Sequence, residues 1–105
     1  MSDRTRRRED GKEDVITRDR VKEPQRFKVA LLNDDYTSME FVVYVLVTVF
    51  HHSQAQATRV MLHIHNHGVG VAGIYSREVA ETRVAQVEQV AKEAGHPLQC
   101  IMEPE

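Results

Sequence analysis

The spacing of apolar and polar residues changes several times along this 105-residue chain, and each spacing predicts a different element. Short apolar stretches bounded by Pro, Asn or Gly are typical of β-strands. On this basis we predict three strands, over Phe27–Leu32, Val69–Tyr75 and Leu98–Met102.

The stretch after the first predicted strand is interpreted as a helix despite its five valines, which have strand propensity. Thr37-Ser38-Met39-Glu40 has the spacing of a capping box, in which the Thr37 hydroxyl accepts from the N–H of Glu40. The apolar residues continue to Phe50. This cap and a length above ten residues favour a buried helix.

Two further helices have clearer amphipathic patterns. One is predicted from Ser53 to Gly68 and the other from Ser76 to Gly95, with serine as the N-cap and glycine as the C-terminal cap in each. The order of elements is therefore β-α-α-β-α-β. We predict an α+β fold in which three strands pack against three helices on one side of the sheet.

Composition divides the chain into two parts. Met1–Arg26 has nine basic and seven acidic residues, and beyond Met1 its only aliphatic residues are Val15, Ile16 and Val21. Because so few apolar residues cannot offset the entropy of ordering the backbone, we predict a disordered N-terminal extension over residues 1–26. Residues 27–105 are predicted to form one domain.

Charge and cysteine content narrow the function classes. The predicted domain has five basic and nine acidic residues, which argues against a nucleic-acid-binding surface. An RNA-associated protein acting through Arg4–Arg8 of the extension stays an alternative. Cys100 is the only cysteine, and the longest apolar run, Phe41–Val47, is too short for a bilayer. With a charged N-terminus, these features predict a cytoplasmic protein without a membrane segment.

The densest group of polar acceptors is Asn33-Asp34-Asp35, where the first strand meets the capped helix. Acceptors beside apolar residues suit a ligand with a positive group and an apolar side chain, such as the free N-terminus of a polypeptide. Apolar side chains from both following helices and the last strand can converge on this turn. The alternative is that those side chains belong only to the core.

Two other kinds of chemistry are compatible with parts of the sequence. His63 and His67 lie at i, i+4 on the second predicted helix, a spacing that suits a metal, whereas His65 points elsewhere. Two ligands do not complete a metal site. A metal-binding regulatory module that uses His63 and His67 is therefore only the alternative function. Asp34, Asp35 and His65 could supply a general base, but no serine or cysteine stands in a nucleophile motif, so we predict that the chain is not an enzyme.

Four segments of this chain resemble one family. They read F-K-V-A-L-L-N-D-D-Y-T-S-M-E-F-V-V, A-T-R-V-M-L-H-I-H-N-H-G, E-V-A-E-T-R-V and H-P-L-Q-C, and they are similar to the ClpS adaptors from Phe27 to about Met102. ClpS adaptors hand N-degron proteins to a Clp-family AAA+ unfoldase and its peptidase. The resemblance implies an antiparallel sheet, a monomer, and neither a cofactor nor a metal.

The resemblance also implies a binding site with two parts. The part that binds the α-amino group of the substrate matches Asn33, Asp34, Asp35 and His65. The pocket for the first side chain, which accepts Leu, Phe, Tyr or Trp, matches Leu32, Thr37, Met39, Val42, Met61, Ile64 and Leu98. In this family the methionine at Met39 rejects β-branched side chains.

A second surface is implied at the start of the third helix. Glu78, Glu81 and Arg83 match positions with which the family docks on the N-terminal domain of a ClpA-like unfoldase, and the N-terminal extension is needed for delivery. The chain departs from the family pattern where Ser38 replaces a common proline, which predicts a looser pocket rim. It departs again at His63 and His67, where the pattern does not call for histidine.

Overall fold

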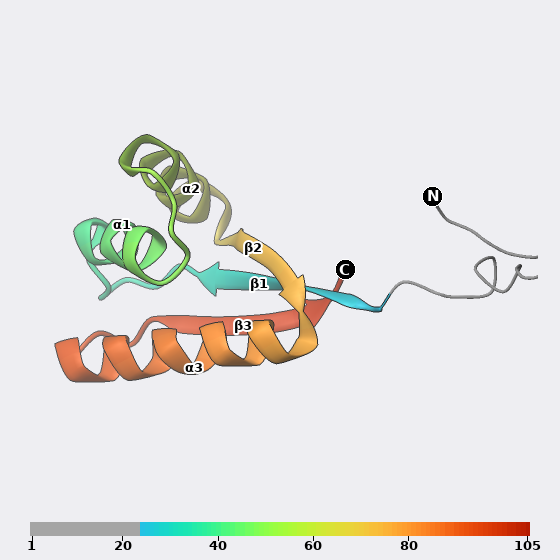
Figure 1. The fold of residues 1–105 in the computed structure, drawn as a ribbon. Coiled ribbons are helices and arrows are strands. Elements are labelled where there is room, and N and C mark those ends of the chain that lie inside the picture. Colours follow the sequence, from blue (N-terminus) through green and yellow to red (C-terminus); the bar gives the residue numbers. More distant parts are fainter. Residues whose placement is uncertain (1–23) are drawn as a thin grey trace, which may run out of the picture.

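The computed structural model describes residues 24–105, so the extension predicted over Met1–Arg26 lies almost wholly outside the described residues. The elements are β1 (Arg26–Leu32), α1 (Met39–Thr48), α2 (Gln54–His67), β2 (Val69–Ser76), α3 (Arg77–Ala94) and β3 (Gln99–Pro104). The predicted order β-α-α-β-α-β is confirmed (Figure 1). In this part of the chain no helix is long and apolar enough to cross a membrane.

The three strands form one antiparallel sheet in the order β2-β1-β3, which confirms the predicted fold class. The first strand lies in the middle, where Leu31 is paired with Gly70 of β2 and Cys100 of β3. The register against β2 shifts between Val29 and Ala30. A central first strand places the residues that follow Leu32 at the end of the sheet, between the helices.

The helices cover one face of the sheet. Side chains alternate between the faces of a strand, and Val29, Leu31 and Cys100 are buried in the core. On the other face Val71 and Ile101 are 44% and 42% exposed. Figure 1 shows α3 running alongside β3, and α1 and α2 packed together near the end of β1.

Burial decides the structure of the valine-rich segment. Val42, Val45 and Leu46 of α1 are buried, and each such side chain contributes about 1.5–3 kcal/mol when it leaves water. This contribution exceeds the free energy by which valine favours a strand, since the whole scale of strand propensities spans only about 1 kcal/mol. The segment is therefore a helix, as predicted, although α1 ends at Thr48 rather than Phe50.

The N-cap of α1 was predicted wrongly. The capping residue is Ser38, whose hydroxyl oxygen accepts from the N–H of Phe41 at 3.1 Å, and not Thr37. The other predicted N-caps, Ser53 and Ser76, are confirmed. The C-terminal glycines of α2 and α3 are confirmed as well, since both adopt positive φ angles (89° and 78°).

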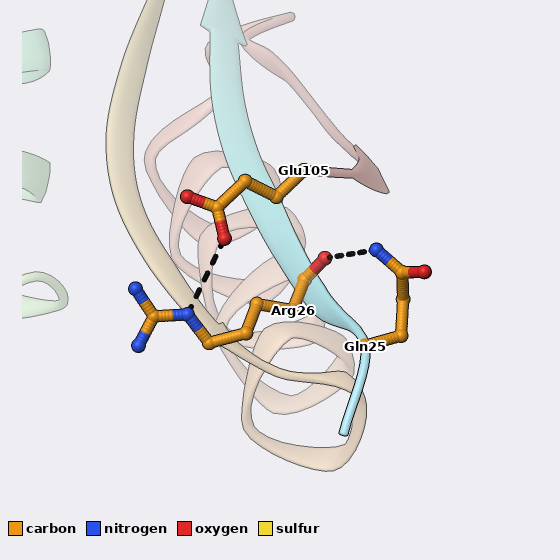
Figure 2. Close-up of polar contacts among 3 residues, drawn as sticks. All are labelled: Gln25, Arg26 and Glu105. Atoms are coloured by element: carbon orange, nitrogen blue, oxygen red, sulfur yellow. Dashed lines mark hydrogen bonds and ion pairs between the residues drawn. The ribbon is translucent and has the colours of Figure 1, made fainter. Parts of the chain in front are cut away.

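The strand boundaries differ slightly from the prediction. β1 begins one residue earlier, at Arg26, and β3 extends from Gln99 to Pro104 instead of from Leu98 to Met102. The start of β1 and the end of β3 lie side by side, as Figure 2 shows for Arg26 and Glu105. Arg26 Nε lies 3.3 Å from Glu105 Oε1. The N–H of Glu105 also donates to the Arg26 carbonyl oxygen at 2.8 Å. Because β1 spans about 20 Å, the described chain begins a full strand length from Asn33.

Candidate functional site

A cavity of about 270 Å³ lies where β1 ends, between the turn that follows it and the helices α1 and α2. It is lined by Asn33, Asp34, Asp35, Thr37, Met39, Val42, Met61, Ile64 and His65. All nine lining residues are among the predicted site residues, so sequence reasoning missed none of them. Two predicted pocket residues do not line the cavity: Leu32 is the half-buried last residue of β1, and Leu98 belongs to the core.

The turn between β1 and α1 is held by the carboxylate of Asp34. Its Oδ1 accepts from the N–H of Tyr36 at 2.8 Å and of Thr37 at 2.6 Å. Its Oδ2 accepts from the Thr37 hydroxyl at 2.7 Å. The next residue, Ser38, supplies the N-cap of α1.

These contacts require an ionised Asp34. Partial burial by itself raises the pKa of this carboxyl group, but the hydrogen bonds from Thr37 and Tyr36, together with the charge of His96, outweigh it. The net result is a pKa below the ordinary value of an aspartate. The turn therefore keeps its negative charge and its shape under mildly acidic conditions.

The remaining polar side chains of the cavity are uncommitted. Within residues 24–105, the side chains of Asn33, Asp35 and His65 form no hydrogen bond, although all three line the cavity. The N–H of Asn33 donates to the carbonyl oxygen of Gly68 at 2.9 Å, which joins the turn to the end of α2. This bond joins a turn and a helix that are far apart in the sequence. Acceptors from both elements therefore face the same cavity.

The deeper walls of the cavity are apolar. Val42, Met61 and Ile64 are at most 9% exposed, whereas Met39 at the rim is 44% exposed. Close packing of α2 against β2 needs a glycine at position 70, because a Cβ there would lie 2.6 Å from Cγ1 of Ile64. Polar groups at the mouth and apolar walls below them suit a ligand with one end of each kind.

The cysteine does not take part in this site. Cys100 lies in the core, and burial, with the nearby charge of Glu88, raises the pKa of its thiol to about 12. Such a thiol stays protonated and unreactive at neutral pH. The histidines at 63 and 67 lie on α2 but do not line the cavity.

The predicted docking residues lie together on the first two turns of α3. Glu78 and Glu81 are exposed, and Glu81 Oε2 lies 3.6 Å from Arg77 Nε. The guanidinium of Arg83 lies 5.6 Å from the centre of the Tyr75 ring. Glu78 and Glu81 thus lie on the exposed side of the helix, whereas Arg83 is half-buried against Tyr75.

The fold and the cavity define a small domain built to bind a ligand, and comparisons with known proteins identify its family. The model of the family described as ATP-dependent Clp protease adaptor protein ClpS matches residues 22–101. A ClpS of Phenylobacterium zucineum is 59% identical over 87 residues, which cover 83% of this chain and 80% of that protein. One of Hyphomonas neptunium is 57% identical over 89 residues, covering 85% and 75%.

A solved structure agrees with these relatives. It is Agrobacterium tumefaciens ClpS2 bound to L-phenylalaninamide, which is 44% identical and has a TM-score of 0.76. The match covers 79% of this chain and all of that one. The chain belongs to the ClpS family, and it is therefore an adaptor of the Clp protease rather than a catalytic enzyme.

Proposed function

We propose that this adaptor binds the free N-terminus of N-degron proteins that begin with Leu, Phe, Tyr or Trp and delivers them to a Clp AAA+ unfoldase and its peptidase. The observation that carries this proposal is a set of three polar side chains at the mouth of an apolar cavity, Asn33, Asp35 and His65, which form no hydrogen bond with residues 24–105.

The number of acceptors suits a terminal ammonium group. An ammonium has three N–H donors and no acceptor. The Asn33 side-chain oxygen, the Asp35 carboxylate and a neutral His65 imidazole can each accept one of them. Asp34 belongs to the same amine-binding group, but we assign it a positioning role, because both of its carboxylate oxygens hold the turn. Its negative charge adds to the attraction.

The apolar part of the cavity would take the first side chain of the substrate. Thr37, Met39, Val42, Met61 and Ile64 surround it. Leu98 supports the pocket from the core, and Leu32 supports it at the end of β1. L-Phenylalaninamide, the molecule bound by the ClpS2 of Agrobacterium tumefaciens, combines a free amine with an apolar side chain, and this chemistry supports the proposal.

The energetics are consistent with a transient complex. Burying a Leu or Phe side chain contributes about 1.5–3 kcal/mol, and each hydrogen bond to a charged group about 1.5–3 kcal/mol. Association costs about 4–15 kcal/mol of lost freedom. At the favourable end, about 12 kcal/mol of contacts less about 4 kcal/mol of lost freedom leaves about 8 kcal/mol, so micromolar is the tightest Kd that these terms allow. An adaptor that must release its substrate to an unfoldase needs affinity of this order.

Delivery would depend on two other parts of the chain, the start of α3 and the N-terminal extension. Glu78, Glu81 and Arg83 would dock a monomeric adaptor on the N-terminal domain of a ClpA-like unfoldase in the cytoplasm. The extension 1–26 would engage the unfoldase during transfer. The described chain begins at the end of β1 opposite Asn33.

Fluorescence anisotropy with labelled peptides tests substrate recognition. Peptides beginning with Phe or Leu are expected to bind, and a peptide beginning with Ile to bind at least about tenfold more weakly, because its branched Cβ meets Met39. Asp35→Asn should weaken Phe-peptide binding by about 10- to 100-fold. Glu40→Gln is the matched control, since it removes an exposed carboxylate that is nearby but outside the cavity lining. Equal affinity for Phe and Ile, or equal losses in both variants, would contradict the proposal.

A further inference from the structure

His96 links the end of α3 to the turn that forms the mouth of the cavity. It directly follows Gly95, the C-terminal cap of α3, and its side chain is half-buried. It does not line the cavity, and the proposed binding of N-degrons does not use it. Its backbone belongs to the end of α3, whereas its ring contacts the start of α1.

The backbone of His96 is held in place from both sides. Its N–H donates to the carbonyl oxygen of Ala91 at 2.9 Å, and the N–H of Gly95 donates to that of Lys92 at 3.2 Å. These two bonds form the Schellman motif that ends many helices. Two residues further along, Leu98 is buried in the core. The side chain of His96 therefore starts from a point that is fixed relative to α3 and the core.

The ring of His96 lies on Phe41, in the first turn of α1. The ring centres are 4.3 Å apart, and the angle between the ring planes is 28°. Such pairs of rings attract one another beyond the area that they bury. The N–H of Phe41 donates to the capping hydroxyl of Ser38 at 3.1 Å. The ring of His96 thus supports α1 at the point where the helix leaves the turn.

His96 also acts on Asp34, whose carboxylate holds the turn. Burial by itself raises the pKa of Asp34, whereas the hydrogen bonds from Thr37 and Tyr36 and the charge of His96 lower it. A charge has this effect on a carboxyl group only when the two side chains lie near each other. His96 is therefore close to both ends of the segment that runs from Asp34 to Phe41.

From these contacts we propose that His96 is a positioning residue for amine recognition. Its ring holds Phe41 and Asp34 in place, and the turn then presents the side chains of Asn33 and Asp35 to the terminal ammonium group. Within residues 24–105 those two side chains form no hydrogen bond, so the turn alone determines where they lie. This role rests on the proposed function, since the ammonium group is the ligand named there.

A positioning role predicts a selective loss of affinity. His96 supports the turn, whereas Met61 and Ile64 line the cavity from α2. Removing the ring should therefore weaken the polar part of the site more than the apolar part. A Phe-first peptide and its N-acetylated form carry the same side chain, so the ratio of their affinities measures the polar part.

Anisotropy with these two peptides, on the full chain, tests the proposal. His96→Ala should weaken binding of the free Phe peptide by at least about fivefold, and of the acetylated peptide by less than about twofold. His96→Phe keeps a ring beside Phe41 and should bind the free peptide within about twofold of the parent chain. His67→Ala is the matched control, because it removes a histidine stacked on another ring at 4.2 Å but outside the cavity lining.

A second measurement needs no peptide. In a pH titration followed by ¹³C spectra, the pKa of the Asp34 carboxyl group should rise toward its ordinary value in both His96 variants, because the charge of His96 is lost. It should not change in His67→Ala. Circular dichroism checks that each variant is folded.

Three results would overturn the positioning role. One is parent-like affinity, or an equal loss for both peptides, in folded His96→Ala. The second is a loss above about fivefold in folded His96→Phe, which keeps the ring. The third is an unchanged pKa of Asp34 in both variants. If the parent chain itself bound the two peptides equally, the proposed function would fail first, and the role of His96 in amine recognition with it.

Discussion

The cavity at the end of β1 and the start of α3 are both candidate binding surfaces, but they are built in opposite ways. The cavity is concave, and three of its polar side chains have no partner in the described chain. The start of α3 is the surface of a helix, and its charged side chains already have neighbours: Glu81 lies beside Arg77, and Arg83 lies on Tyr75.

This difference determines how closely each surface specifies its ligand. Unpaired acceptors above apolar walls specify a ligand with several donors and an apolar side chain. A helix surface with charges of both signs specifies only that its partner carries complementary charges. A peptide ligand can therefore be proposed from geometry, whereas family membership supports only the Clp protease as the partner.

The largest expected effect is a loss of affinity for the unfoldase when the start of α3 is changed, with peptide binding unaffected. If the proposed docking surface is right, replacing Glu78, Glu81 and Arg83 together by alanine should weaken the complex with the N-terminal domain of a ClpA-like unfoldase by more than about 30-fold, because three charged side chains would be lost from it. Affinity for a Phe peptide should not change. Surface plasmon resonance measures the first quantity and anisotropy the second. A parallel loss of both would mean that the surfaces are not independent.

The two adjacent aspartates should separate stability from binding. Asp34→Ala removes the acceptor of two backbone N–H groups and one hydroxyl, so the free energy of unfolding should fall by about 1–3 kcal/mol. Asp35→Ala is the matched control, since the Asp35 side chain makes no hydrogen bond within residues 24–105. It should unfold at nearly the same urea concentration as the parent. If Asp35→Ala were the more destabilised variant, the assignment of roles would be wrong.

The stability of the folded domain should depend on Asp34 at acid pH. Its pKa is lowered in the folded chain, so its stabilising contribution is complete above the pKa of the unfolded state, about 3.9, and is lost as the pH falls through the lower folded-state value. Urea denaturation at a series of pH values should show this acid-dependent loss in the parent chain and not in Asp34→Ala. The same loss in the variant would exclude Asp34 as its source.

The smallest effects come from the helix caps. Ser38→Ala and Ser76→Ala each remove a hydroxyl acceptor at a helix N-terminus and should each cost about 1 kcal/mol of stability. Only Ser38→Ala should also weaken peptide binding, because Ser38 adjoins the cavity-lining residues Thr37 and Met39. Only Ser76→Ala should weaken docking on the unfoldase. Urea denaturation and the two binding assays together check this pattern.

Local sequence patterns predicted the elements well, because caps, glycines and apolar spacing are local signals. The predicted N-cap of α1 was wrong because Thr37 and Ser38 are neighbouring hydroxyls that are both able to cap: the Thr37 hydroxyl donates to Asp34, and the Ser38 hydroxyl accepts from Phe41. The first of these bonds gives Asp34 its positioning role. Spacing alone does not reveal which of two neighbouring hydroxyls a carboxylate engages.

The cavity could be predicted only in part. Leu98 is apolar and buried, as predicted, yet it packs in the core rather than lining the cavity, and burial in either place leaves the same apolar signal.

The central claim is that the cavity recognises a free terminal amine, and the most direct test compares one Phe-first peptide with its N-acetylated form by anisotropy. Acetylation removes the charge and two of the donors while leaving the apolar side chain unchanged. We predict a loss of affinity of at least about 100-fold, because Asn33, Asp35 and His65 would lose hydrogen bonds to a charged group. Equal binding of the two peptides would contradict the claim and reduce the site to an apolar pocket.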